Sequence, residues 1–291
     1  MSFLFNFDAP ESDPADTGSP EPCKDLTDVS PAFEVKDFLN SLSSKLDLKQ
    51  LTFGKHTLNI VDTSSIEEKI LEEKDTLSSS EKIIKAVVSH SDLVAGEYEG
   101  GLKIWECGLD LISYLSSHPS GTSLDIKRKL VLELGCGVGL PGLYCIKCGA
   151  QRVDFQDYNE EVLQILTHTN VVNNSEGGEV SSQFFAGDWA SFSQLAEQQN
   201  LRYDIILSAE TIYNTENYPK LHQVFKATLA QNGLVLLAAK EYYFGVGGSI
   251  AAFEEFVTKQ NCFSIVTMHT ITEGIARKIL CLRHLSSQEP S

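Results

Sequence analysis

The sequence lacks a long apolar run and a basic cluster, and it has few basic residues for its length. No apolar segment approaches the roughly 18 residues that a membrane-spanning helix needs. Only 23 Lys and Arg stand against 40 Asp and Glu, a formal net charge of −17 over 291 residues. Because surfaces that bind nucleic-acid phosphates are normally basic, we expect no direct nucleic-acid partner. The apolar start MSFLFNF has no basic residue and is followed by acidic ones, so neither a secretory signal nor a membrane partner is expected.

The cysteines bear on the redox compartment. The seven cysteines are odd in number and lie mostly in apolar segments, which predicts reduced thiols in the cytoplasm or nucleus. Cys145 and Cys148 form a CxxC motif, which zinc or redox chemistry can use. No second pair or His cluster lies at ligand spacing, however, and the motif falls inside a helical pattern. We therefore expect this pair to pack in the core, and we expect no metal site.

Composition divides the chain near residue 31. Residues 1–31 hold five of the nine prolines and seven acidic residues against the single Lys24, which predicts a disordered acidic tail. The predicted organisation is this tail, an N-terminal helical or mixed subdomain at 32–90, a main domain at 91–285 and a short tail at 286–291.

The predicted subdomain carries three local patterns. Apolar residues spaced three to four apart predict a helix over Phe33–Leu48, and residues 57–61 predict a strand. Ser64, followed by two glutamates, predicts the capped start of a helix at Ile66.

From residue 91 onward, strand and helix patterns alternate. Several strands are continuous apolar runs, as expected when both faces of a parallel sheet are covered. Alternation of this kind predicts an α/β fold with a doubly wound, Rossmann-like sheet of seven strands. A short turn around 272–274 separates the last two strands, which predicts a hairpin and an antiparallel C-terminal edge. The predicted strands are 129–134, 152–157, 183–187, 203–208, 233–239, 263–270 and 277–284, and the predicted helices are 141–148, 159–173, 190–199, 217–230 and 249–260.

A glycine-rich loop follows the first of these strands. Gly135, Gly137 and Gly139 alternate there, so the backbone can turn tightly and approach a ligand. Gly137, Gly139 and Gly142 also fit the dinucleotide fingerprint G-x-G-x-x-G, so a nicotinamide cofactor has to be considered. Glu133 argues against it, because a carboxylate beside the loop would repel a pyrophosphate and suit an ammonium group. S-adenosylmethionine carries an amino-acid moiety and a sulfonium but no phosphate, and it suits the loop better.

Polar residues also end the next two strands. Asp157, 22 residues after Gly135, can accept both hydroxyls of a ribose, although an Asp at this position is often only a helix N-cap. Asp188 can accept from an adenine amino group, and Trp189 can stack on the adenine or pack in the core. Parallel strands end at one edge of the sheet, so the three side chains are expected to meet there.

Five sequence blocks carry a resemblance to a known family. They are SHSDL (89–93), YEGGLKIWEC (98–107), QDYN (156–159), SAETIYN (208–214) and YFGVGG (243–248). Over residues 88–284 the chain resembles the histidine protein methyltransferase 1 homologues, which are seven-strand S-adenosylmethionine-dependent protein methyltransferases. The resemblance implies methyl transfer to the tele nitrogen of a histidine in a large-subunit ribosomal protein, with an effect on ribosome assembly or translation.

The resemblance also implies site residues, a partner and a location. The partner would be a basic ribosomal protein, and the protein would be a monomer of the cytoplasm and nucleus, including the nucleolus. His90 would be a self-methylation site, although a histidine there is more often a surface or capping residue. The cofactor contacts carried over, together with Glu133, are Ile104, Trp105, Glu106, Cys107, Gly108, Gly135, Gly137, Gln156, Asp157, Tyr158, Gly187, Asp188, Trp189 and Ser208.

The candidate catalytic residues are Glu210 and Tyr213. Glu210 can accept the proton on the second ring nitrogen of the target, or it is a structural hydrogen-bond partner. Trp105 or Tyr213 can face the sulfonium or wall the target ring, or simply pack. Tyr242, Tyr243 and Phe244 are expected to form a lid over the acceptor channel. The competing functions are a lysine methyltransferase of the same fold, a cofactor-binding chaperone for a basic protein, and a nicotinamide-dependent oxidoreductase.

Overall fold

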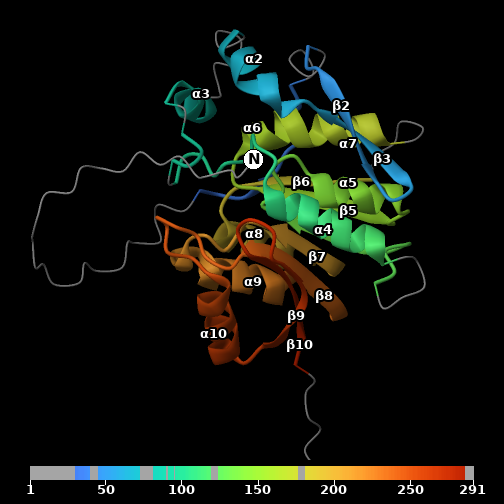
Figure 1. The fold of residues 1–291 in the computed structure, drawn as a ribbon, viewed down its shortest axis with the longest axis vertical. Helices are drawn as coiled ribbons and strands as arrows, with labels where there is room; N and C mark the ends of the chain where they lie inside the picture. Colours follow the sequence, from blue (N-terminus) through green and yellow to red (C-terminus); the bar gives the residue numbers. More distant parts are fainter. Residues whose placement is uncertain are drawn as a thin grey trace, which may run out of the picture.

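The computed structural model describes residues 30–39, 45–72, 81–89, 91–94, 96–118, 124–175 and 181–285. Within these ranges the protein is an α/β fold: an eight-stranded sheet lies between two layers of helices, and a separate two-stranded hairpin packs beside it (Figure 1). The strand order of the large sheet is β1-β6-β5-β4-β7-β8-β10-β9. No helix in the described part of the chain is long and apolar enough to cross a membrane.

Five parallel strands form the centre of the sheet, as the apolar runs predict. Their alternate residues face two different clusters of buried side chains; Val131 belongs to one and Leu132 to the other. Both faces are therefore covered by helices, which explains why these strands are apolar throughout. The strands are β4 (Leu130–Leu134), β5 (Arg152–Asp157), β6 (Phe184–Ala186), β7 (Tyr203–Ala209) and β8 (Leu229–Lys240).

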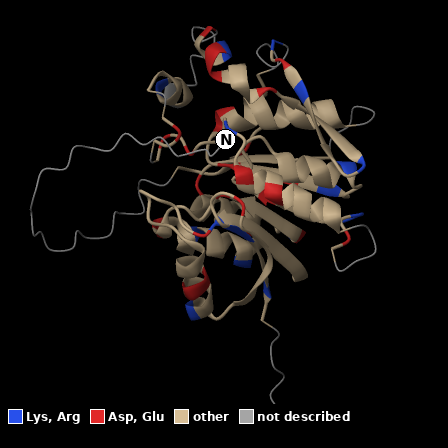
Figure 2. Cartoon of the chain, in the orientation of Figure 1, with Lys and Arg blue, Asp and Glu red and all other residues tan. Residues whose placement is uncertain are grey.

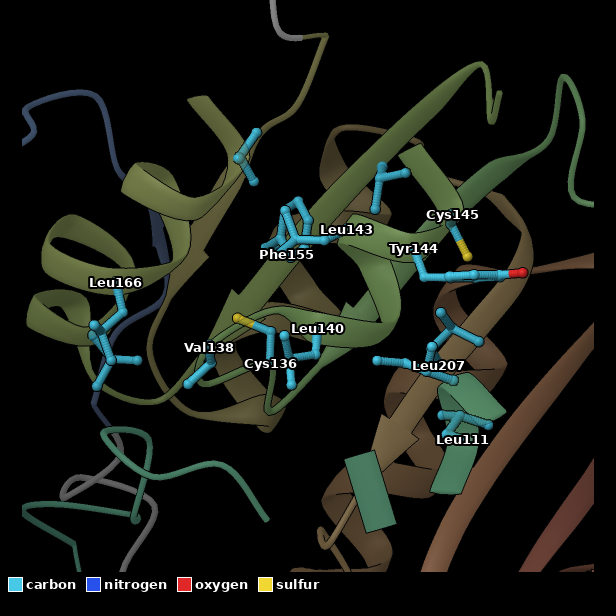
Figure 3. Packing of buried hydrophobic residues seen from close by; sticks show 14 of the residues in the cluster. Leu111, Cys136, Val138, Leu140, Leu143, Tyr144, Cys145, Phe155, Leu166 and Leu207 are labelled. Carbon is cyan, nitrogen blue, oxygen red and sulfur yellow. The ribbon is translucent and has the colours of Figure 1, made fainter. Parts of the chain in front are cut away.

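The first helical layer packs on one face of the sheet. It consists of α4 (Glu106–Ser117), α5 (Leu140–Lys147) and a continuous helical stretch of α6 (Glu160–Val162), η3 (Leu163–Thr167) and α7 (His168–Asn174). Helix α4 is absent from the sequence prediction, although Leu111, Ile112 and Leu115 are spaced for one buried face. Cys145 of α5 is buried and free, as expected, in the cluster that Figure 3 shows.

The second layer covers the other face. It consists of α8 (Trp189–Gln198), α9 (Tyr218–Thr228) and α10 (Ile250–Gln260), at the lower side of Figure 1. The predicted C-terminal hairpin is confirmed. β9 (Phe263–Ile271) and β10 (Arg277–His284) pair antiparallel, and β10 inserts between β8 and β9.

The predicted helix over Phe33–Leu48 is wrong in its described part. Phe33 and Glu34 form strand β1, which pairs antiparallel with the edge of β6, and Val35 N–H donates to Phe184 O at 2.7 Å. The pairing depends on Gly187, because a Cβ on it would lie 2.5 Å from Pro31 O. Residues 33–34 pair with the otherwise unpaired edge of β6, so the sheet has eight strands and not the predicted seven.

The other described elements before residue 90 agree more closely with the sequence prediction than β1 does. Strands β2 (Leu48–Phe53) and β3 (His56–Val61) form a hairpin, followed by η2 (Thr63–Ser65), α2 (Ile66–Glu72) and α3 (Glu81–Val88). The strand at 57–61 and the helix start at Ile66 are thus confirmed, but the cap is Asp62, whose Oδ1 accepts from Ser64 N–H at 3.1 Å, and not Ser64 itself.

The hairpin packs on α7 through two asparagines. Asn170 Oδ1 accepts from Val61 N–H at 2.7 Å, and Asn174 Oδ1 accepts from Asn59 N–H at 2.9 Å. Leu58 and Ile60 join the same buried cluster as the first helical layer.

The predicted boundary between the N-terminal subdomain and the main domain, at residue 90, stays a prediction. Both predicted tails, apart from Ser30 and Pro31, lie outside the described residues, as does His90.

Candidate functional site

A cavity of about 800 Å³ lies at the carboxyl ends of β4, β5, β6 and β7. It is large enough for a small-molecule ligand together with part of a second one. The segment before α4 and the loop after β7 complete its walls. Most of the site residues named from the sequence line it: Ile104, Trp105, Gly108, Glu133, Gly135, Gly137, Asp157, Tyr158, Gly187, Asp188, Trp189, Glu210 and Tyr213.

Four of the named residues do not line the cavity, and two of them, Gln156 and Ser208, contact residues that do. Gln156 donates to Gly187 O and accepts from the Trp189 indole N–H, both at 2.8 Å, so it fixes the end of β6. Ser208 is buried, with its Oγ 2.7 Å from Thr211 Oγ1. Cys107 is buried at the start of α4, and the Glu106 carboxylate lies 3.9 Å from the Arg277 guanidinium.

The glycine loop has the geometry that its sequence suggests. Gly137 has a φ of +49°, and a Cβ there would lie 3.1 Å from Gly101 O, so the backbones of two loops meet at this residue. Its N–H donates to Asp157 Oδ2 at 2.8 Å. Cys136 and Val138, on either side, belong to the hydrophobic core (Figure 3). The loop therefore forms a backbone cradle at the cavity, with side chains between its glycines that pack in the core.

Two buried carboxylates hold this cradle. Glu133 Oε2 accepts from Gly142 N–H at 2.7 Å, and burial raises the pKa of Glu133 to about 8. Asp157 accepts from Gly137 N–H and from Asn159 N–H (2.8 and 3.0 Å). Burial raises the pKa of Asp157 to about 6, and the charge of Glu99 contributes in the same direction. Both carboxylates thus bind protein backbone while also lining the cavity.

At the end of β6, Asp188 caps a helix, a role that the sequence suggested only for Asp157, and its predicted contact with an adenine amino group stays a prediction. Its Oδ1 accepts from Ala190 N–H at 2.7 Å and caps α8, and its Oδ2 pairs with Lys220 Nζ at 2.7 Å. Trp189 lines the cavity with its ring held through its N–H by Gln156. An indole fixed in this way offers a flat wall for an aromatic ligand group.

The charge of the cavity distinguishes between the two candidate cofactors. Its lining includes seven acidic residues, at 97, 99, 133, 157, 188, 210 and 216, but only two lysines, Lys103 and Lys220. Each lysine is paired with an aspartate, Asp92 or Asp188. A pyrophosphate would meet net negative charge here, whereas a sulfonium and an ammonium are matched by it. The residues present therefore fit S-adenosylmethionine and not a nicotinamide dinucleotide.

Glu210 lies in a compact charged cluster at the wall of the cavity. It has a φ of +59°, a strained conformation that is uncommon outside glycine and is often found at functional sites. Its carboxylate is only 6% exposed; Oε2 accepts from Tyr243 OH at 2.6 Å and Oε1 lies 3.3 Å from Lys240 Nζ. Lys240, itself 3% exposed, lies 5.5 Å from the Trp105 ring centre. The sequence signal for this partner is a lysine that ends the apolar run of β8.

Glu99 is a cavity residue that was not named from the sequence as a site residue. It accepts a hydrogen bond from Tyr213 OH, and its own N–H donates to Asn159 Oδ1 at 3.0 Å. Burial raises the pKa of Tyr213 well above its usual value, and the charge of Glu99 adds to this shift. Glu99 lies in the YEGGLKIWEC block, so a signal was present, but nothing in the spacing connects it with Tyr213.

The predicted aromatic lid is wrong for Tyr243. Its ring is buried, and its hydroxyl reaches Glu210 behind the cavity wall. Tyr242 and Phe244 are 51% and 70% exposed, and neither lines the cavity. The turn at Gly248 explains this arrangement, since Gly248 N–H donates to Tyr213 O and Tyr243 N–H donates to Gly248 O.

The fold and this cavity define an S-adenosylmethionine-dependent methyltransferase, and comparisons with known proteins agree. A family model described as "Lysine methyltransferase" matches residues 91–245. The chain belongs to the family of histidine protein methyltransferase 1 homologues. It is 39% identical to the one from Bos taurus over 84% of this chain and 71% of the relative, and 38% identical to the one from Rattus norvegicus over 94% and 80%.

More distant comparisons support the fold. The histidine protein methyltransferase 1 from Saccharomyces cerevisiae is 27% identical over 85% of this chain and 84% of the relative. Among solved structures, "a putative sam-dependent methyltransferase from Streptococcus mutans" aligns with a TM-score of 0.51 at 12% identity, over 81% of this chain and 55% of that one. At that identity the likeness concerns the fold alone. The methyl donor of this chain is S-adenosylmethionine.

Proposed function

We propose that this protein methylates the tele nitrogen of a histidine in a large-subunit ribosomal protein, with an effect on ribosome assembly or translation. The observation that carries the histidine assignment is the identity to relatives named histidine protein methyltransferases across most of both chains. The ribosomal target is supported by the resemblance of the sequence blocks and by charge. Figure 2 shows acidic residues along α2, α4 and α10, and the cavity walls are acidic, so a basic partner would be attracted.

The cofactor supplies, when bound, a methyl group on a positively charged sulfur. The glycine cradle would hold the amino-acid part of the cofactor, and Asp157 would hold its ribose. Trp189 would pack against its adenine. Trp105 and Tyr213 would restrict the target ring, which raises the rate by alignment and exclusion of water. The target nitrogen donates its lone pair to form the N–CH3 bond while the S–CH3 bond breaks and leaves its electron pair on sulfur. The positive charge thereby passes to the imidazole ring.

Histidine suits this site chemically. Imidazole has a pKa of about 6.5, so most target rings are neutral and carry a lone pair at pH 7. The chain therefore needs no strong base, only groups that orient the ring and stabilise its developing charge. The acidic cavity can do the latter. The proposal also places the protein in the cytoplasm and nucleus, where ribosomal proteins are made and assembled, acting as a monomer.

A lysine target is the second candidate, because the matching family model is described as "Lysine methyltransferase". A lysine ammonium has a pKa of about 10.4 and must lose its proton before attack. Its rate would therefore keep rising well above neutral pH, whereas a histidine rate would level off above about pH 7.5. The pH–rate profile separates the two targets.

The test is incubation of the purified full-length protein with isotopically labelled S-adenosylmethionine and either ribosome-containing or ribosome-depleted lysate. Tandem mass spectrometry then locates the label. We expect methylhistidine in one large-subunit protein, only in the ribosome-containing sample. Asp157→Ala is the cofactor-deficient control and should give no label. Label on lysine, or label that does not depend on ribosomes, would contradict the proposal.

A further inference from the structure

Two carboxylates of the cavity are candidates for orienting the target imidazole, and their surroundings differ. Glu210 and Glu99 both line the cavity, on the loop after β7 and on the segment before α4. A histidine whose tele nitrogen is to be methylated must carry its proton on the pros nitrogen. Which ring nitrogen carries the proton is set by the hydrogen bond that the other one makes. One of the two carboxylates can supply that bond.

The charge of Glu210 is already compensated. Oε1 pairs with the buried ammonium of Lys240 at 3.3 Å, and Oε2 is occupied by the hydroxyl of Tyr243 at 2.6 Å. A carboxylate bound to a buried cation is a weak acceptor for a second positive group, because much of its field is cancelled by its partner. These contacts favour the structural role for Glu210, in which it fixes the wall formed by Trp105 and β8.

The charge of Glu99 is not compensated in this way. Among the residues that the structure describes, no Lys or Arg forms an ion pair with it. Tyr213 OH occupies Oε2, and Oε1 has only a long contact, 3.3 Å from Gly96 N–H. An ionised carboxylate offers about four acceptor positions, so Glu99 can accept a further N–H.

The position of Glu99 is also fixed. Its N–H donates to Asn159 Oδ1, and Asn159 Nδ2 donates to Glu97 O at 2.7 Å. Tyr158 OH binds Gly96 O, also at 2.7 Å. The segment is thereby anchored on the residues directly after Asp157, next to the expected ribose site. Glu99 is close enough to Asp157 for its charge to raise the pKa of that group.

We propose that Glu99, held by Tyr213, accepts the hydrogen bond from the pros N–H of the target imidazole. This inference rests on the proposed function and names the residue that directs methylation to the tele nitrogen. During transfer the pros N–H stays on the ring, which becomes an imidazolium paired with Glu99. The proton passes to solvent after release. Tyr213 is then a positioning residue that orients the Glu99 carboxylate.

The test compares full-length wild type, Glu99→Gln, Glu99→Ala and Tyr213→Phe, with Glu255→Gln as the matched control. Glu255 is exposed on α10, outside the cavity, and its substitution removes the same charge. The acceptor is the protein of ribosome-containing lysate. The readouts are the affinity for S-adenosylhomocysteine by calorimetry, the initial rate, and the ratio of tele- to pros-methylhistidine in hydrolysed product.

We expect all variants to bind S-adenosylhomocysteine within about twofold of wild type, which also verifies folding. Glu99→Gln should lower the rate about 100-fold and keep the tele isomer, because its amide oxygen still accepts a hydrogen bond. Glu99→Ala should lower the rate further and yield pros-methylhistidine in the residual product. Tyr213→Phe should lower kcat about tenfold with little change in KM, and Glu255→Gln should match wild type.

Three outcomes would overturn the Glu99 proposal. The first is an unchanged rate and isomer ratio in Glu99→Ala. The second is a rise of more than tenfold in the dissociation constant for S-adenosylhomocysteine, which would make Glu99 a cofactor ligand. The third is a wild-type product on lysine, which would overturn the proposed function as well. A wild-type product on histidine combined with either of the first two outcomes rejects Glu99 alone.

Discussion

The hydroxyl of Tyr213 donates a hydrogen bond to the carboxylate of Glu99, 114 positions earlier in the chain. The contact joins the loop after β7, which holds Glu210 and Tyr213, to the glycine-containing segment before α4. Both segments line the same cavity, so the bond ties the loop after β7 to the segment whose Glu99 lies close to Asp157. Several consequences of this arrangement and of its surroundings can be measured.

Gly137→Ala should weaken the binding of S-adenosylhomocysteine at least tenfold. A side chain at this φ of +49° is strained, and its Cβ would lie 3.1 Å from Gly101 O, so the cradle must open. The matched control is Gly149→Ala, which has a φ of +81° but whose Cβ would meet only Lys127 Cγ at 3.9 Å. Calorimetry on both variants checks this. Equal losses of affinity would mean that strain, and not the cradle, is responsible.

Glu133→Gln should make the unfolding free energy less dependent on pH. The pKa of Glu133 is raised to about 8 by burial and is near 4.5 when unfolded. Between these values unfolding releases a proton, so the stability of the wild type falls as pH rises, by up to about 1.4 kcal/mol per pH unit from this group. Urea unfolding at pH 6.5 and 7.5, without cofactor, measures the two slopes. Parallel slopes for wild type and variant would contradict the prediction.

Lys240→Met should destabilise the protein by about 3–5 kcal/mol, because it leaves the buried carboxylate of Glu210 without its cation. The control is Lys278→Met, whose partner Glu241 is half exposed; its loss should cost less than about 1 kcal/mol. Adding Glu210→Gln to Lys240→Met should recover part of the stability. Urea denaturation measures all three. A cost for Lys240→Met no larger than that of the control would refute a buried ion pair here.

Asn170→Ala should release the β2–β3 hairpin from α7. Its amide accepts from Val61 N–H at 2.7 Å and donates to Val138 O at 2.9 Å, and both groups would be left without partners. We expect a loss of about 2–4 kcal/mol and faster proteolysis within residues 48–61. Asn173→Ala, on the same helix but partly exposed, is the control and should stay within about 0.5 kcal/mol of wild type. Equal protease resistance of both variants would argue against the contact.

The elements that were predicted correctly are those whose signal is local. Continuous apolar runs identified β4, β5, β7 and β8, and the bounds of β10 agree with residues 277–284. The glycine loop and the polar strand ends could be placed at one edge because parallel strands all end there. The shared edge follows from the parallel topology of the sheet. The alternation of strand patterns with helix patterns along the sequence already implies that topology.

Helix α4 was missed although its signal is local, whereas strand β1 and the buried Tyr243 were mispredicted because they depend on distant partners. Phe33–Glu34 is a strand only because the edge of β6, about 150 residues later, is open to pairing. The helical spacing of a few apolar residues carries no information about whether a distant strand edge is available for pairing. Likewise Tyr243, expected in a lid, turns inward because Glu210 offers its hydroxyl a buried acceptor.

The sequence by itself determined the class of protein, the methyl donor and the edge of the sheet where the cavity lies. These depend on glycines, carboxylates and an indole at fixed places relative to strands. Only the tertiary structure decided how the two candidate carboxylates differ. Lys240 compensates Glu210, whereas Tyr213 orients Glu99 without cancelling its charge. The strength of an acceptor depends on the charges around it in space, and those come from residues that lie 30 and 114 positions away in the chain.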